Sequence, residues 1–247
     1  MDFEYSEKVQ ALIATLETFM DEHVYPIEQE FRMWTSEEAN RWKVWPGLAA
    51  LKEKARALGL WNLFLPLEYG EISPGLTNLE YAPLAEVMGR VPWAPEIFNC
   101  SAPDTGNMEV LAKFGTEQQK SDWLDPLLDG RIRSAFVMTE PGVASSDATN
   151  VETSIVREGD EYVINGRKWW ISGIMEPECE LLLVMGKSDP EAERHVQQST
   201  IIVPRNTPGV SIVRNLRTFN NWHSPGGESE VLLDNVRVPV GNMILGE

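Results

Sequence analysis

Two short stretches combine small, hydroxyl and aromatic side chains in an order that could hold a polar, planar ligand. The first is FVMTEPGVASSD, from Phe136 to Asp147. A strand is expected to end at Thr139, and a Pro-Gly turn then exposes successive backbone N–H groups beside small residues. The hydroxyls of Thr139, Ser145 and Ser146 could serve carbonyl or phosphate oxygens. Taken alone, the stretch fits equally well an ordinary loop with capping serines.

The second stretch is NGRKWWISG, from Asn165 to Gly173. Neighbouring residues of a strand point to opposite faces, so one of Trp169 and Trp170 can pack in the core while the other forms a flat wall. Ser172 follows on the face of Trp170. A tryptophan wall with a nearby hydroxyl would suit a heterocycle with polar edge atoms. The alternative is that both tryptophans are packing residues.

Helical elements precede these stretches. Apolar residues recur at helical spacing, Pro26 should interrupt the first segment, and Thr77 with Glu80 forms a capping-box pattern. Gly59 is expected to end a helix in the left-handed conformation, and Thr116 to begin one. The predicted helical segments are 6–33, 46–58, 77–90, 104–114 and 116–129.

Strands and turns take over near residue 134. Gly159 and the pair Asn165-Gly166 are predicted hairpin turns. The pattern indicates an α+β chain, with an all-helical N-terminal domain over 1–132 and an antiparallel, β-barrel-like domain over 133–247. No GxGxxG follows a strand, so a Rossmann site has no support. The predicted strands are 134–139, 151–157, 162–165, 180–185, 200–203, 210–213 and 229–233.

Composition excludes several classes of protein. The chain has 247 residues, with 21 Lys and Arg against 38 Asp and Glu, a net charge of −17. Such a surface repels nucleic acid. Cys100 and Cys179 lie far apart, and the histidines lack metal-ligand spacing, so we expect a reducing compartment and no metal site. No apolar run approaches the roughly 20 residues of a membrane span, and the N-terminus has no secretory signal.

Several motifs in one order resemble the acyl-CoA dehydrogenase flavoproteins. They are the two stretches above, Phe114–Gly130 (FGTEQQKSDWLDPLLDG), Leu65–Gly70 (LPLEYG) and Asn235–Pro239 (NVRVP). The resemblance covers essentially the whole chain. The loop departs from the common TEPxxGSD form by one extra residue, with Ala144-Ser145 in place of a glycine. That variant is similar to vertebrate members fused to a kinase-like domain, which carry a VASSDATN run.

The resemblance implies an FAD site. Thr139 would bond the flavin ring, Trp170 would stack beside it, and Ser172 would contact the edge near N5. Ser145 and Ser146 would meet the FAD pyrophosphate and the coenzyme A arm of the substrate, and Ser188 would touch coenzyme A. The full cofactor-binding set is Phe136, Met138, Thr139, Ala144, Ser145, Ser146, Trp170, Ile171 and Ser172, and the substrate-binding set is Ser146 and Ser188.

The implied reaction is α,β-dehydrogenation of an acyl-CoA thioester, in which a base removes the α-proton and hydride passes to flavin N5. An electron-transfer flavoprotein would then accept the electrons. The catalytic base is expected in a C-terminal four-helix bundle absent from this sequence, so no catalytic residue is assigned. Glu140 belongs to the flavin-binding turn and is not that base. The family context implies fatty acid β-oxidation, in a homotetramer or a heteromer with a C-terminal-domain partner. The expected location is the bacterial cytoplasm, or the mitochondrial matrix or peroxisome of a eukaryote.

Three alternatives stay open. The chain could be a non-catalytic FAD- or CoA-binding or scaffolding subunit of a heteromeric enzyme. It could be a flavin monooxygenase or nitroalkane oxidase of the same fold. It could also be a helical-plus-β domain that binds no coenzyme A and has a tryptophan-rich core.

Overall fold

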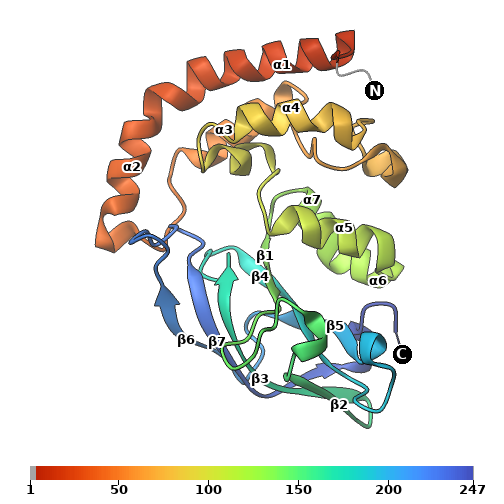
Figure 1. The fold of residues 1–247 in the computed structure, drawn as a ribbon. Helices are drawn as coiled ribbons and strands as arrows, with labels where there is room; N and C mark the ends of the chain where they lie inside the picture. Colours follow the sequence, from red (N-terminus) through yellow and green to blue (C-terminus); the bar gives the residue numbers. More distant parts are fainter. Residues whose placement is uncertain (1–3, 247) are drawn as a thin grey trace. The chain divides into compact units, whose positions relative to one another are not determined.

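The computed structural model describes residues 4–246, which form two compact units (Figure 1). The first contains residues 4–40 and Val44–Thr105, and the second contains Arg41–Lys43 and residues 106–246. The predicted domain boundary at residue 132 stays a prediction. No helix within residues 4–246 is both long enough and apolar enough to cross a bilayer.

Helices build the first unit, as predicted. They are α1 (Glu7–Phe19), α2 (Glu28–Ser36), α3 (Leu48–Ala57) and α4 (Asn78–Met88). Between α1 and α2 the chain passes through a π-helical turn and a 3-10 turn, and the 3-10 turn contains Pro26. A proline has no N–H to donate and crowds the preceding turn, which accounts for the interruption.

The predicted capping box at Thr77 and the predicted helix end at Gly59 are confirmed. The Thr77 hydroxyl accepts from the N–H of Glu80, whose carboxylate accepts from the N–H of Thr77. Gly59 has a φ of +70° just beyond α3. Helix α1 packs against α4, and the rings of Phe19 and Phe98 meet edge to face at 5.2 Å in the core of this unit.

In the second unit, short helices precede the sheet. They are α5 (Asp104–Phe114), α6 (Glu117–Gln119) and α7 (Asp125–Leu128), with a π-helical turn between the last two. Thr116 caps α6 in a capping box with Gln119. The Gln119 amide also donates to the carbonyls of Gly241 and Met243, at 2.9 and 3.1 Å, and so fastens the last turn of the chain to the helices.

Seven strands form one curled sheet (Figure 1). Their order is β1-β4-β2-β3-β7-β6, with β5 paired to β4. Side chains of Val, Ile and Leu from these strands form a continuous buried core. The bounds are β1 (Arg133–Val137), β2 (Ser154–Glu158), β3 (Glu161–Ser172), β4 (Cys179–Lys187), β5 (Gln198–Pro204), β6 (Val210–Leu216) and β7 (Glu228–Pro239).

The α+β class with a helical region before the sheet is confirmed, but the sheet is mixed rather than antiparallel. Strand β1 pairs with β4 in parallel, and β2 meets β4 in parallel through Ser154 and Lys187. The connection from β1 to β4 contains the hairpin β2–β3, which is long enough to bring the chain back in the same direction. A reading of strands one after another could not identify these non-sequential neighbours.

The predicted turn at Asn165-Gly166 is wrong, whereas the turn at Gly159 is confirmed. Strand β3 runs through Asn165-Gly166 and only shifts register against β7. Gly166 lies against Thr153, whose Oγ1 would be 2.1 Å from a Cβ at this position. The glycine is therefore needed for close approach to a neighbouring side chain and not for a reversal of the chain.

Candidate functional site

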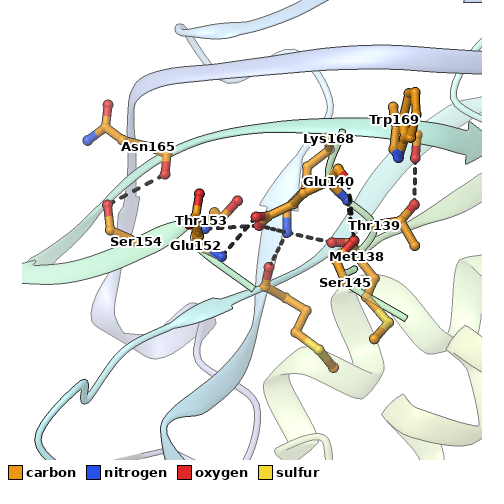
Figure 2. Close-up of polar contacts among 11 residues, drawn as sticks. Met138, Thr139, Glu140, Ser145, Glu152, Thr153, Ser154, Asn165, Lys168 and Trp169 are labelled. Atoms are coloured by element: carbon orange, nitrogen blue, oxygen red, sulfur yellow. Dashed lines mark hydrogen bonds and ion pairs between the residues drawn. The ribbon is translucent and has the colours of Figure 1, made fainter. Parts of the chain in front are cut away.

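A buried ion pair fastens the turn after β1 to strand β3 (Figure 2). The Lys168 side chain is fully buried, and its Nζ lies 2.9 Å from Glu140 Oε1. The same ammonium donates to the carbonyl oxygens of Met138 and Met185, both at 2.7 Å. Its three N–H donors are thus all used. Lys168 thereby joins β3, β4 and the segment that follows β1.

Glu140 completes this network. Its carboxylate accepts from the backbone N–H groups of Glu152 and Thr153, at 2.8 and 2.9 Å. Burial alone would raise the pKa of Glu140, but hydrogen bonds from Thr153, Lys168 and Glu152 outweigh it and hold the pKa below its ordinary value. Burial lowers the pKa of Lys168, against the attraction of Glu140. Glu140 is therefore an ionised structural group.

Thr139 and Trp169 make a two-way contact that joins the two sequence stretches. The Thr139 hydroxyl donates to the Trp169 carbonyl at 2.6 Å (Figure 2). The backbone N–H of Trp169 donates to the Thr139 carbonyl at 2.9 Å. The hydroxyl proton is thus used inside the protein, while Oγ1 keeps lone pairs that can accept from an N–H of a ligand. The structure therefore places Thr139 beside the tryptophan pair.

The backbone leaves regular strand geometry at Trp170. Its φ is +54°, and the pairing of β3 with β7 shifts between Lys168 and Ile171. Such a conformation costs an ordinary residue about 1–3 kcal/mol, and residues that adopt it cluster at functional sites. Trp170 is also 42% exposed. Both observations indicate that the Trp170 ring forms one side of a ligand site and is not a core-packing residue.

Ser172, at the end of β3, faces Glu228 at the beginning of β7. Its Oγ lies 3.0 and 2.9 Å from the two carboxylate oxygens of Glu228. Burial raises the pKa of Glu228, while Ser172 and His223 act in the opposite direction. The sequence analysis missed Glu228, since nothing in an acidic residue at the start of a strand signals a partner 56 positions away.

We expect Ser172→Ala to raise the pKa of Glu228 further, because it removes a hydrogen bond that favours the ionised form. Since the folded pKa already lies above the unfolded one, this carboxyl stabilises the fold below its unfolded pKa and loses that contribution as pH rises through the folded pKa. Carboxyl-carbon NMR titration measures the pKa, with Glu228→Gln to assign the signal. A titration curve that does not move, or moves to lower pH, would contradict the prediction.

The other predicted cofactor residues differ in accessibility. Ser145 is buried inside the turn, where its Oγ accepts from the N–H of Glu140 at 2.6 Å. Ile171 is buried in the core of the sheet. Ala144 and Ser146 are exposed. The remaining two, Phe136 and Met138, are half-buried in and just after β1.

Ser188 lies just after β4, and its hydroxyl is 2.6 Å from that of Ser199 on β5. The Ser188 N–H donates to the Gln197 carbonyl at 2.9 Å. These contacts account for the serine as part of a turn, and its assignment to coenzyme A stays a prediction.

A groove of about 620 Å³ lies beside the turn at Pro141-Gly142. Three charged residues on its wall were missed by the sequence analysis, and Glu152 is one of them. The other two, Arg214 and Glu230, are distant in sequence from both motif stretches. Strands β3, β6 and β7 bring them together. The wall includes Glu152, Gly166, Arg167, Trp169, Arg214 and Glu230.

Comparison with known protein families finds two matches in chain order. The N-terminal domain of acyl-CoA dehydrogenases matches residues 6–131, and the middle domain of the same enzymes matches residues 135–236. The chain belongs to the acyl-CoA dehydrogenase family. The resemblance inferred from the motifs is thereby confirmed for the N-terminal and middle domains.

Individual family members agree with this assignment. Mouse acyl-CoA dehydrogenase family member 10 is 54% identical over 98% of this chain, and FadE2 of Mycobacterium tuberculosis is 53% identical over all of it. A Mycobacterium abscessus protein assigned as an acyl-CoA dehydrogenase has a solved structure with a TM-score of 0.93 at 49% identity, matching 98% of this chain.

The acyl-CoA dehydrogenase relatives are longer than the part that this chain matches. The chain spans 23% of the mouse protein, 60% of FadE2 and 61% of the M. abscessus chain. At 22% identity, a Mycobacterium smegmatis glutaryl-CoA dehydrogenase solved with FADH2 shares the fold, with a TM-score of 0.72. The ChsE4–ChsE5 complex of M. tuberculosis, at 24% identity, does so as well.

Proposed function

We propose that this chain forms the FAD-binding part of an acyl-CoA dehydrogenase, which oxidises the α,β-bond of an acyl-CoA thioester. The observation that carries the proposal is the exposed Trp170, in a strained conformation, directly after the residue that bonds Thr139. A glutaryl-CoA dehydrogenase of M. smegmatis is solved with FADH2. An exposed aromatic ring at Trp170 is what we expect of a residue that packs against the flavin ring.

The residues of the site fit a flavin. Trp170 offers an exposed flat face, Thr139 keeps an acceptor oxygen, and Ser172 adds a hydroxyl at the exposed end of β3. When bound, the flavin would accept a hydride from the substrate. The protein's own part is to hold the ring at one face and to exclude water around the acyl chain.

We propose that the base which removes the α-proton lies C-terminal to the middle domain, in the helical bundle of the family. Glu140 is unsuited to that task because its oxygens already accept from Lys168 and from two backbone N–H groups. Electrons would pass to an electron-transfer flavoprotein. The assignment to fatty acid β-oxidation, and assembly as a homotetramer or with a partner subunit, belong to the same proposal.

Anaerobic mixing with acyl-CoA tests the proposal. With FAD and a family C-terminal segment supplied, an acyl-CoA should bleach the visible flavin band and yield a 2-enoyl-CoA. The chain alone should hold FAD weakly and turn over little. Bound flavin that no acyl-CoA bleaches would contradict the proposal and would favour a monooxygenase. Rapid turnover by the chain alone would contradict the placement of the base.

A further inference from the structure

Two arginines project into the groove from different strands and share one buried carboxylate. Arg167 Nε donates to Oε1 of Glu230, and Arg214 Nε donates to Oε2 of the same residue, each at 2.5 Å. Glu230 is 1% exposed. A buried carboxylate has to be paired, so Glu230 fixes the positions of both guanidinium groups. Hydrogen bonds from Arg214 and Arg167 hold the pKa of Glu230 below its ordinary value.

Both guanidinium groups keep donors for something outside the protein. Only the Nε atom of each donates to Glu230, and within residues 4–246 the terminal nitrogens of Arg167 and Arg214 make no hydrogen bond or ion pair. The side chains are 56% and 62% exposed. The two arginines and Glu230 together carry a net charge of +1, on a chain whose net charge is −17, and Glu152 on the same wall opposes it.

The shape and lining of the groove narrow the class of ligand. Guanidinium N–H pairs match the oxygens of phosphate groups in a bidentate way. Trp169 lies on the same wall and offers an aromatic surface. A volume of about 620 Å³ is within the range of small-molecule and cofactor sites. The wall also carries Glu152, an exposed carboxylate that would oppose a bound anion. Within the described residues its side chain makes no ion pair, unlike those of Glu140 and Glu230.

We propose that Arg167 and Arg214, held in place by Glu230, bind the pyrophosphate group of a nucleotide in this groove. FAD and coenzyme A both carry a pyrophosphate, and naming them as its sources rests on the proposed function. The anion site itself rests only on the two arginines and their shared carboxylate.

Calorimetric titration of the chain with inorganic pyrophosphate tests the site. We expect Arg167→Gln and Arg214→Gln each to weaken binding by about tenfold or more, because each removes a charge-assisted contact. Since these variants unbalance Glu230, Arg167→Lys serves as a second test: it keeps a cation for Glu230 but loses the fork, and should also weaken binding. Glu152→Gln should tighten binding a few-fold, because it removes an opposing charge.

Arg237→Gln is the matched control. Arg237 is an exposed arginine of β7 that also bonds two carboxylates, those of Glu158 and Glu161, but it does not line the groove. Its loss should leave pyrophosphate binding unchanged. No measurable binding of pyrophosphate by the parent chain, or equal weakening by Arg237→Gln, would overturn the proposal.

Parallel titrations with FAD and with coenzyme A identify the source of the pyrophosphate. The ligand whose affinity falls in the groove variants is the one that the groove holds. If FAD binding depends on Trp170 but neither FAD nor coenzyme A responds to the groove variants, the groove does not hold a nucleotide pyrophosphate and this proposal is refuted, while the proposed function survives. If pyrophosphate binds through the arginines but FAD and acyl-CoA do not bind, the anion site is supported and the proposed function fails.

Discussion

Lys168→Met is expected to lower the free energy of unfolding by about 3–5 kcal/mol, the usual effect of removing one member of a buried ion pair. The substitution leaves Glu140 ionised and buried with only backbone donors, and leaves the carbonyls of Met138 and Met185 without their shared donor. Urea unfolding at pH 7 measures the change.

Unfolding is measured at pH 7 because of the pKa of Glu140. That pKa is held below its ordinary value, so the carboxylate's contribution is fully present above the unfolded pKa of about 4.3 and is lost as pH falls through the folded pKa. At pH 7 the measurement therefore probes the ionised pair.

Two further variants make the Lys168 result specific. Adding Glu140→Gln to Lys168→Met should recover part of the lost stability, because the uncompensated buried charge is removed. Arg237→Gln, which breaks two exposed ion pairs, should leave the unfolding midpoint nearly unchanged. A loss of less than about 1 kcal/mol in Lys168→Met would mean that the buried pair does not hold the turn to β3.

The second large effect concerns flavin binding by Thr139 and Trp170. We expect the double variant Thr139→Val, Trp170→Ala to weaken FAD binding by about 100-fold, since it removes an aromatic wall and a hydrogen-bonding oxygen. Flavin fluorescence during titration with FAD gives the affinity, measured for parent and variant with a family C-terminal segment supplied. Because Trp170 is exposed, replacing its side chain leaves no core cavity.

Phe219→Ala is the control for this variant, since Phe219 is a fully exposed aromatic residue of the same unit, at 101%. It should retain the parent affinity for FAD. Circular dichroism should give the same spectrum for parent and double variant, which separates ligand loss from unfolding. With a family C-terminal segment supplied, a double variant that binds FAD and oxidises acyl-CoA as well as its parent would refute the flavin site at these two residues.

Helix ends and the family were predictable because their signals are local. The Thr77-Glu80 box and the N-cap at Thr116 satisfy backbone donors within one turn, so the nearby sequence was sufficient to place them. The order of motifs was likewise read along the chain, and both domain matches agree with it. The same local reasoning failed at Gly166, where a turn was predicted and the actual cause is the side chain of Thr153.

Only the tertiary structure decided which residues share a site. Thr139 and Trp169 are in contact although they lie 30 positions apart in the sequence. Arg167 bonds Glu230, which lies 63 positions further along the chain. Such pairs depend on strand order and register, which the sequence does not encode locally: β1 beside β4 in parallel, and β3 between β2 and β7. The sequence by itself determined the residue types needed for a polar, aromatic site and the helices before it. The sheet decided their partners, since a strand's neighbours are chosen by burial of whole faces rather than by adjacent residues.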